Sequence, residues 1–406
     1  LSVLYEPAYD RVKFGSAMDP FMGLLDISEY DATLLVEDLN NIIEAVHELV
    51  DLNVLGFALF EEELDWANSS AVSNLVETIF GLNYLRVKTD DIISYVSENI
   101  YDISTIKASQ IDLAADGLLI GEAVDILLET LIVSGRIEFN SMDDLEALTS
   151  IDIMALIEKE VLLNVLDAVQ CIVDTTIVKA ATGFVVEKHE DFVPADFLFV
   201  FETGITGDEL HEDICSIITI AREVVESDMY QIVTGKDFSL VGISGHINRI
   251  LDELLHLNII SIDTAHIIQN VLAMAGIEVE YEDLAAVDYE ADYAKIYEII
   301  EIVEEVLVEN LGVTTYFGLL EIDLTIENEA LISNENLHAV LDILSNVVNL
   351  ELFSAVFTPA YEQMVSPMLG ESLDASLLAF TDLSEYPVEL LVEDLNNIIE
   401  AVHELV

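Results

Sequence analysis

The sequence predicts a mainly α-helical protein made of helical tandem repeats, solenoid-like or stacked as three-helix units, with short β-strands or hairpins between them. Three observations predict this fold class: apolar residues recur at helical spacing, one long segment occurs twice, and a weaker, shorter period lies between the two copies. Hydrophobic residues form 53% of the 406 residues, which is enough to bury a large core and is unlike a disordered acidic tail.

The helical spacing is clearest between Leu34 and Val50. Its apolar residues stand three or four positions apart, as they do along one face of a helix. They are Leu35, Leu39, Ile42, Val46 and Leu49. We expect this face to be buried and the acidic residues beside it to form a solvated surface. Those residues are Glu37, Asp38, Glu44 and Glu48.

The segment LLVEDLNNIIEAVHELV occurs at Leu34–Val50 and again, unchanged, at Leu390–Val406, an offset of 390 − 34 = 356 residues. Upstream, DISEYDAT matches DLSEYPVE in the same register. We therefore expect a window cut from a tandem array, holding one full period and a partial overlap, with Leu1 and Val406 at opposite ends of an elongated object. The alternative is a duplicated end segment inside one finite protein. Because the chain begins at Leu1 without Met, we expect a piece of a longer chain or a processed product.

The shorter period predicts four helical units. Leu-Asn pairs at Asn83, Asn164 and Asn258 are expected to end helices in a left-handed conformation, and Thr89 and Asp263 to cap the helices that follow. The predicted division gives residues 1–33 to the end of a preceding repeat, 34–116, 117–206, 207–289 and 290–389 to the four units, and 390–406 to the start of the next repeat.

Short strands are predicted between the helices, where residues alternate or favour β-structure. The predicted strands are Arg136–Phe139, Phe197–Glu202, Ile277–Tyr281 and Leu320–Ile326.

The charge balance excludes several classes of partner. The chain has 79 acidic and 13 basic residues, a net charge of −66, so it has little with which to neutralise the phosphates of nucleic acid or of an anionic membrane surface. No uncharged apolar run reaches the roughly 18 residues of a membrane-spanning helix. We expect no nucleic-acid partner and no membrane span.

The search for chemistry finds no catalytic or cofactor-binding residue, because zinc-site spacing, phosphate loops and nucleophile motifs are all missing. The chain is therefore expected not to be an enzyme. Cys171 and Cys215 are interpreted as buried thiols, with a disulfide between them as the alternative. Acidic clusters could hold Ca²⁺ or other divalent cations, as defined sites or as loose counterions. The candidate ligands are Glu61, Glu62, Glu63, Asp65, Asp143, Asp144, Glu146, Glu280, Glu282 and Asp283.

The stretch DISEYDATLLVEDLNNIIEAVHELVDLNVL resembles the long acidic helical repeat regions of giant surface proteins from Firmicutes-type bacteria. The resemblance implies an extracellular, structural or adhesive role. This chain differs from that family in having few Lys residues, which argues against binding to the cell wall through basic residues. From the repeat and this resemblance we expect a structural protein that forms an acidic fibre, filament or surface stalk with copies of itself. The alternative is a helical-repeat scaffold that binds a protein or an apolar ligand.

Overall fold

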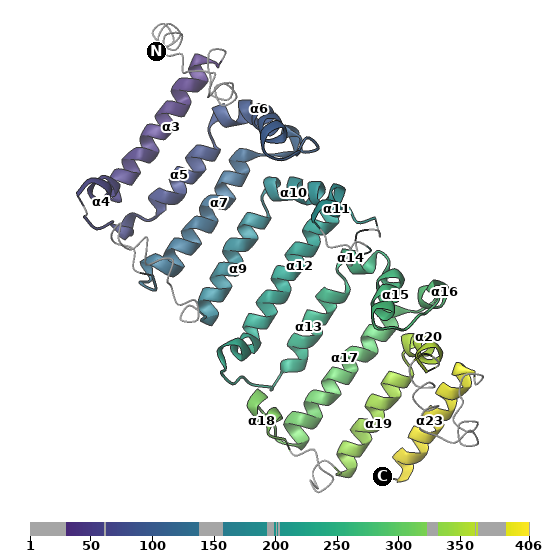
Figure 1. Ribbon diagram of the computed structural model, residues 1–406. Coiled ribbons are helices and arrows are strands. Elements are labelled where there is room, and N and C mark those ends of the chain that lie inside the picture. Colours follow the sequence, from purple (N-terminus) through teal and green to yellow (C-terminus); the bar gives the residue numbers. More distant parts are fainter. Residues whose placement is uncertain are drawn as a thin grey trace. The chain divides into compact units, whose positions relative to one another are not determined.

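The structure is a computed structural model that describes residues 30–60, 62–137, 157–192, 199, 201, 204–322, 332–361, 363 and 387–405. This part of the chain is mainly α-helical, as predicted (Figure 1). The chain divides into two compact units, one of Leu1–Phe192 with Thr206–Ile218 and the other of Val193–Ile205 with Thr219–Val406. The finer division into four units remains a prediction.

In the first unit, long helices lie side by side (Figure 1): α7 packs between α5 and α9, and α3 packs against α5 and α6. The shorter helix α10 packs against α7 and α9. The described helices are α3 (Ala32–Asp51), α4 (Val54–Phe60), α5 (Ser70–Phe80), α6 (Asn83–Asn99), α7 (Leu113–Leu127), α9 (Lys159–Val173), α10 (Thr176–Glu187) and α11 (His189–Phe192). A π-helical stretch, Leu128–Val133, continues α7, and the division between the units falls within α12 (Gly207–Glu226).

The second unit repeats this style of packing. Helix α17 lies between α13 and α19, and α23 packs against α19 and α20. Small apolar clusters form its core, one around Phe238 and Leu240 and another around Leu284. Its further described helices are α13 (Ile243–Leu255), α14 (Asn258–Ser261), α15 (Thr264–Met274), α16 (Tyr281–Ala285), α17 (Tyr289–Glu305), α18 (Tyr316–Leu320), α19 (Asn334–Val348), α20 (Glu351–Ala360) and α23 (Val388–Leu405).

The predicted helix boundaries agree with the structure in one case and disagree in four. Asp263 caps α15 as predicted, because its side chain accepts a hydrogen bond from the His266 N–H. Thr89 instead lies inside α6, where its hydroxyl donates to the Leu85 carbonyl, so the predicted cap is wrong. The predicted helix ends are also wrong: Asn83 and Asn258 are each the first residue of a helix, and Asn164 lies inside α9. At Asn83 the reason is a buried aspartate, described below.

The strand prediction is wrong at Ile277–Tyr281, because the residues up to Glu280 form no strand and Tyr281 begins α16. Leu320 is likewise the last residue of α18. The other predicted strands fall largely outside the described residues. Within the described ranges, β-pairing is limited to a single antiparallel bridge between Ser239 and Thr315.

Two further expectations concern membranes and the ends of the chain. In the described ranges, no single helix has the length and apolar composition to cross a membrane. Two pairs of helices, α9 with α10 and α19 with α20, have that length and composition only when both members are taken together, and each pair is sharply bent. Leu1 and Val406 lie outside the described residues, so the expected separation of the chain ends remains a prediction.

Candidate functional site

A buried aspartate on a long helix holds the start of a later helix. Asp38 of α3 is only 3% exposed, so the predicted solvated position is wrong. Its carboxyl group accepts hydrogen bonds from the backbone N–H groups of Asn83 and Tyr84, at 2.9 and 3.0 Å, and from the Asn83 side chain. The first N–H groups of a helix have no partner within the helix, and Asp38 supplies one for α6. Tyr30 also donates to Asp38, and burial together with this bond raises the pKa of the Tyr30 phenol.

The same arrangement occurs on α7 and on α17. Asp116 is fully buried and accepts from the backbone N–H groups of Thr176 and Ile177, at 2.6 and 3.1 Å, and from the Thr176 hydroxyl. Asp292 is 3% exposed and accepts from the backbone N–H groups that begin α20, both at 2.8 Å. Three long helices are thus each tied through one carboxyl group to a helix about 45 to 60 residues further on.

The three aspartates share a short sequence pattern, which also occurs at the exposed Asp102 and so does not identify them by itself. Each is followed four residues later by Ile, and the same Asp-x-x-x-Ile pattern occurs at Asp213, which is 3% exposed on α12. The interval from Asp38 to Asn83 is 83 − 38 = 45 residues, and from Asp213 to Asn258 it is 258 − 213 = 45. The Leu-Asn pairs at Asn83 and Asn258 thus mark two helix starts that each follow an aspartate by 45 residues, whereas Asn164 lies inside α9.

The repeated segment is a helix in both places, and its two copies are covered on different faces. We define the leading face of α3 as Val36, Leu39, Ile43 and Val46, and its trailing face as Asp38, Ile42, Ala45 and Leu49. In α3 every leading-face residue is exposed, whereas Asp38 and Ala45 are each 3% exposed and the other two trailing-face residues are partly buried. The predicted burial of Leu39 and Val46 is therefore wrong: α5 and α6 cover the neighbouring face.

In α23 the pattern is reversed. Its leading face is partly buried, and its trailing face is exposed, with Ile398 at 59% and Leu405 at 85%. The helices that pack on it are α19 and α20. The α23 leading face consists of Val392, Leu395, Ile399 and Val402, and its trailing face of Asp394, Ile398, Ala401 and Leu405. One sequence of seventeen residues thus packs through opposite sides in its two positions.

Polar contacts fix the register of α23 on α19. The side-chain amides of Asn349 and Asn396 each donate to the other's oxygen, both at 2.9 Å. The rings of His338 and His403 are nearly parallel with centroids 4.8 Å apart, and their Nδ1 atoms are 2.6 Å apart, so one ring donates and the other accepts. Asp342 lies 3.4 Å from Nε2 of His403. In α3 the matching residues, Asn40 and His47, are exposed.

The predicted metal ligands are only partly described. Glu62, Glu63 and Asp65 are exposed, and their polar contacts include the hydrogen bond that Glu62 accepts from Asn53 and the one that Asp65 accepts from the Ala67 N–H. The second described cluster is also exposed and consists of Glu280, Glu282 and Asp283. Glu61, Asp143, Asp144 and Glu146 lie outside the described residues. A role for these clusters in binding cations remains a prediction.

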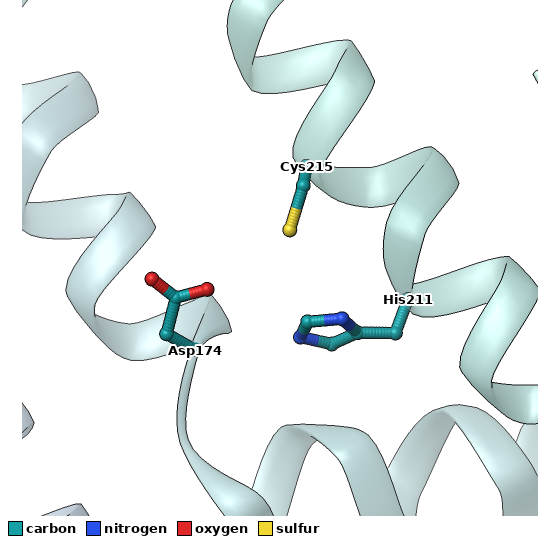
Figure 2. Close-up of side chains that lie close together, drawn as sticks. All are labelled: Asp174, His211 and Cys215. Carbon is teal, nitrogen blue, oxygen red and sulfur yellow. The ribbon is translucent and has the colours of Figure 1, made fainter.

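A different group has metal-ligand character in the described ranges. Ligand atoms of Asp174, His211 and Cys215 all lie within 4.8 Å of one another, and their side chains converge from α12 and from the end of α9 (Figure 2). His211 is 7% exposed, and its Nε2 is 2.8 Å from the Val173 carbonyl, which orients the ring. Sequence analysis missed this group because Asp174 is 37 residues before His211, since 211 − 174 = 37.

The Asp174 group offers donor types that are found in zinc sites. Tetrahedral zinc ligands lie roughly 3.3 to 3.8 Å apart, given bond lengths of about 2.0 to 2.3 Å. The amide of Gln170 also donates to Asp174, at 2.9 Å, and contacts the Cys215 sulfur at 3.5 Å. In this arrangement the group links α9 to α12 through hydrogen bonds. Cys171 and Cys215 form no disulfide, and both are only partly buried, so the predicted full burial of these thiols is wrong. Partial burial is the main cause that raises the pKa of the Cys171 thiol.

Comparisons of the chain with protein-family models, curated proteins and solved structures find no match. A functional assignment for this chain therefore depends on its own residues and contacts.

Proposed function

We propose that the chain is a segment of a tandem-repeat structural protein, in which successive periods pack directly on one another to form an extended acidic fibre or surface stalk. The observation that carries the proposal is the reversed packing of the seventeen-residue helix in its two positions. In α3 the trailing face meets the helices that follow in sequence, and in α23 the leading face meets the helices that precede it. One helix with both faces covered would join two periods.

The recurring aspartates support the same proposal. An array needs the same local contact in every unit, because each unit covers the apolar face of its neighbour. The contact from Asp38 to α6 recurs from Asp116 to α10 and from Asp292 to α20. The units would then be the predicted three-helix repeats, although without the predicted strands at Ile277–Tyr281. A location at the cell surface belongs to this proposal through the resemblance of the helical segment.

The test is a series of chains with one, two and three periods, made by appending residues 51–406 after Val406 so that successive periods share one helix. We expect the maximum dimension in small-angle X-ray scattering to rise by the same increment with each added period. A matched series carries Leu395→Asp in every shared helix and should lose this regular increment. A dimension that grows only as the cube root of the mass, as for a compact globule, would contradict the proposal.

A further inference from the structure

The leading face of α3 is an exposed apolar stripe. Val36, Leu39, Ile43 and Val46 are 39%, 36%, 55% and 48% exposed, and they follow one another at intervals of three and four residues. Val50, at 49%, extends the stripe by one more turn. Contiguous apolar surface of this kind marks an interaction site more often than scattered single residues do.

The occupant of this stripe can be identified because the same stripe is covered elsewhere in the chain. On α23 the identical residues pack against α19 and α20. The polar residues beside the stripe are matched there as well: Asn349 pairs with Asn396, and His338 and Asp342 meet His403. The surface formed by α19 and α20 is therefore complementary to the leading face of this sequence, whichever copy supplies it.

We infer that the leading face of α3 is a docking surface for the α19–α20 pair of a second copy of this chain, which it reaches by replacing that copy's own α23. Asn40 then takes the position of Asn396 opposite Asn349, and His47 takes the position of His403 beside His338. The inference rests on the proposed function, but it concerns separate chains rather than periods joined in one chain.

The α19–α20 surface can bind the chain's own α23 or the α3 of a second copy, and tethering decides between these two states. The two helices are identical over the docked segment, so their contacts with α19 and α20 are the same. The chain's own α23 has an advantage because a tethered segment acts at an effective concentration of about a millimolar. Docking of α3 in its place is therefore suppressed in dilute solution and favoured when α23 is weakened. The contact joins two different surfaces of the chain, so it propagates head to tail and does not close into a two-fold dimer.

The experiment places the same pair of substitutions in each copy of the helix. Leu395→Asp with Ile399→Asp puts two charges on the docked face of α23 and opens the α19–α20 surface. Leu39→Asp with Ile43→Asp puts them on the exposed face of α3. Sedimentation velocity of the full chain is measured from about 1 to 20 µM, a range that lies well below the effective concentration of the tether. About 0.5 M NaCl is included so that repulsion between copies is screened.

We expect the wild type and the α3 variant to stay monomeric, and the α23 variant to form a concentration-dependent series of oligomers. Combining both pairs should return the chain to monomer, since no leading face remains to dock. Oligomers that persist in the combined variant would show non-specific association and overturn the inference. An α23 variant that stays monomeric throughout the concentration range would overturn it too. The matched control is Val87→Glu on α6, because Val87 is 55% exposed, as Ile43 is, and lies off the leading face.

A second measurement covers the case in which the α23 variant loses helix content. A chain with Asn40→Cys is mixed under mild oxidation with a chain carrying Asn349→Cys, both with Cys171→Ser and Cys215→Ser. We expect a disulfide-linked dimer in the mixture, with a yield that falls when Leu39→Asp is added to the first chain. A yield no higher than that from Val87→Cys in place of Asn40→Cys would overturn the inference. If the joined periods extend regularly in scattering while these tests fail, the proposed function stands and only docking between chains is refuted.

Discussion

A carboxyl group removed from water is stabilising only when its oxygens accept enough hydrogen bonds, and Asp116 receives three. Two of the donors are backbone N–H groups at the start of α10, where the helix dipole also favours negative charge. Composition and periodicity cannot separate such an aspartate from the many solvated acidic residues of the same helices. The distinction depends on whether a helix start from a distant part of the sequence lies within hydrogen-bond distance.

Asp116→Ala should therefore lower the stability of the chain. The substitution leaves the N–H groups of Thr176 and Ile177 without their acceptor in a buried place, at a cost of about 2 to 4 kcal/mol in the free energy of unfolding. Urea denaturation followed by circular dichroism measures this difference. Glu122→Ala, at an exposed position on the same helix, is the control and should change the free energy by less than about 0.5 kcal/mol. Equal effects of the two substitutions would contradict the role of Asp116.

Glu223 makes a pH-dependent contribution to the stability of the folded chain. Its carboxylate accepts hydrogen bonds from Arg249, at 2.8 Å, and lies 2.8 Å from Nδ1 of His246. The bond from Arg249 is the largest cause that lowers the pKa of Glu223. A lowered folded-state pKa adds stability above the ordinary glutamate pKa of about 4.3, and this stability is lost as pH falls through the folded value.

The expected cost of Glu223→Gln is about 1 kcal/mol at neutral pH, a modest figure because Arg249 is largely exposed and water screens the pair. Below the folded pKa of Glu223 the variant and the wild type should be equally stable. Unfolding free energies of both proteins, measured at a series of pH values from neutral to acid, check this. A difference that stays constant through the acid range would show that charge is not involved.

At the level of helices, a close contact in the first unit occurs where α5 crosses α7. A Cβ atom built on Gly117 would lie 2.6 Å from the Cβ of Phe80, and one built on Gly121 would lie 2.7 Å from the side chain of Glu77. The absence of side chains at these two positions, one turn apart, lets the two helices approach closely. The flexible side chain of Glu77 can move away from a Cβ added at Gly121. The contact at Gly117 is with the Cβ of Phe80, which can move only if the backbone of α5 moves.

Gly117→Ala should destabilise the chain by about 1 to 3 kcal/mol, because overpacking at Phe80 must push the two helices apart. The same exchange at Gly183, on α10, meets open space and should stabilise by about 0.5 to 1 kcal/mol through higher helix propensity. Thermal melts of the two variants beside the wild type test both signs. If both substitutions shift the melting temperature in the same direction, helix propensity and not the close crossing of α5 and α7 determines their effect on stability.

The helical character of these elements could be predicted from the sequence, because apolar residues at intervals of three and four are local features of the chain. The face that packs could not be predicted in the same way. In LLVEDLNNIIEAVHELV both faces carry apolar residues, and the stripe through Leu39 and Val46 was as regular as the one through Ile42 and Ala45. Which side is covered depends on the neighbouring helices, and the two copies have different neighbours. The Asp174 group escaped prediction for a related reason, since its members meet only through packing of α9 with α12.

For the whole chain, charge is the dominant feature. With 79 acidic and 13 basic residues, ion pairs can neutralise only a small part of the surface. Folding brings like charges closer together than they are in the unfolded chain, so repulsion opposes the folded state. Salt shortens the screening length from about 10 Å at 0.1 M to about 3 Å at 1 M, and divalent cations bind carboxylates directly.

The melting temperature should therefore rise with high NaCl and, at much lower concentration, with Ca²⁺, and fall in low salt with a chelator. Thermal melts in these three buffers measure the effect, and NaCl at the ionic strength of the Ca²⁺ buffer separates screening from binding. Coincident curves in all buffers would mean that packing outweighs the surface charge.

The reversed packing of the repeated helix has a consequence for how the sequence can vary. In the proposed array, an internal copy contacts one neighbour through its leading face and another through its trailing face, so few of its positions are left to change without harm. A substitution such as Ile43→Asp or Ala45→Asp would disturb a boundary between two periods, and not one period alone. The adjoining octets DISEYDAT and DLSEYPVE differ at four of eight positions, whereas the helix itself is unchanged over seventeen. We therefore expect amino-acid differences between successive periods to be concentrated in the segments beside the shared helix and to be rare in the helix itself.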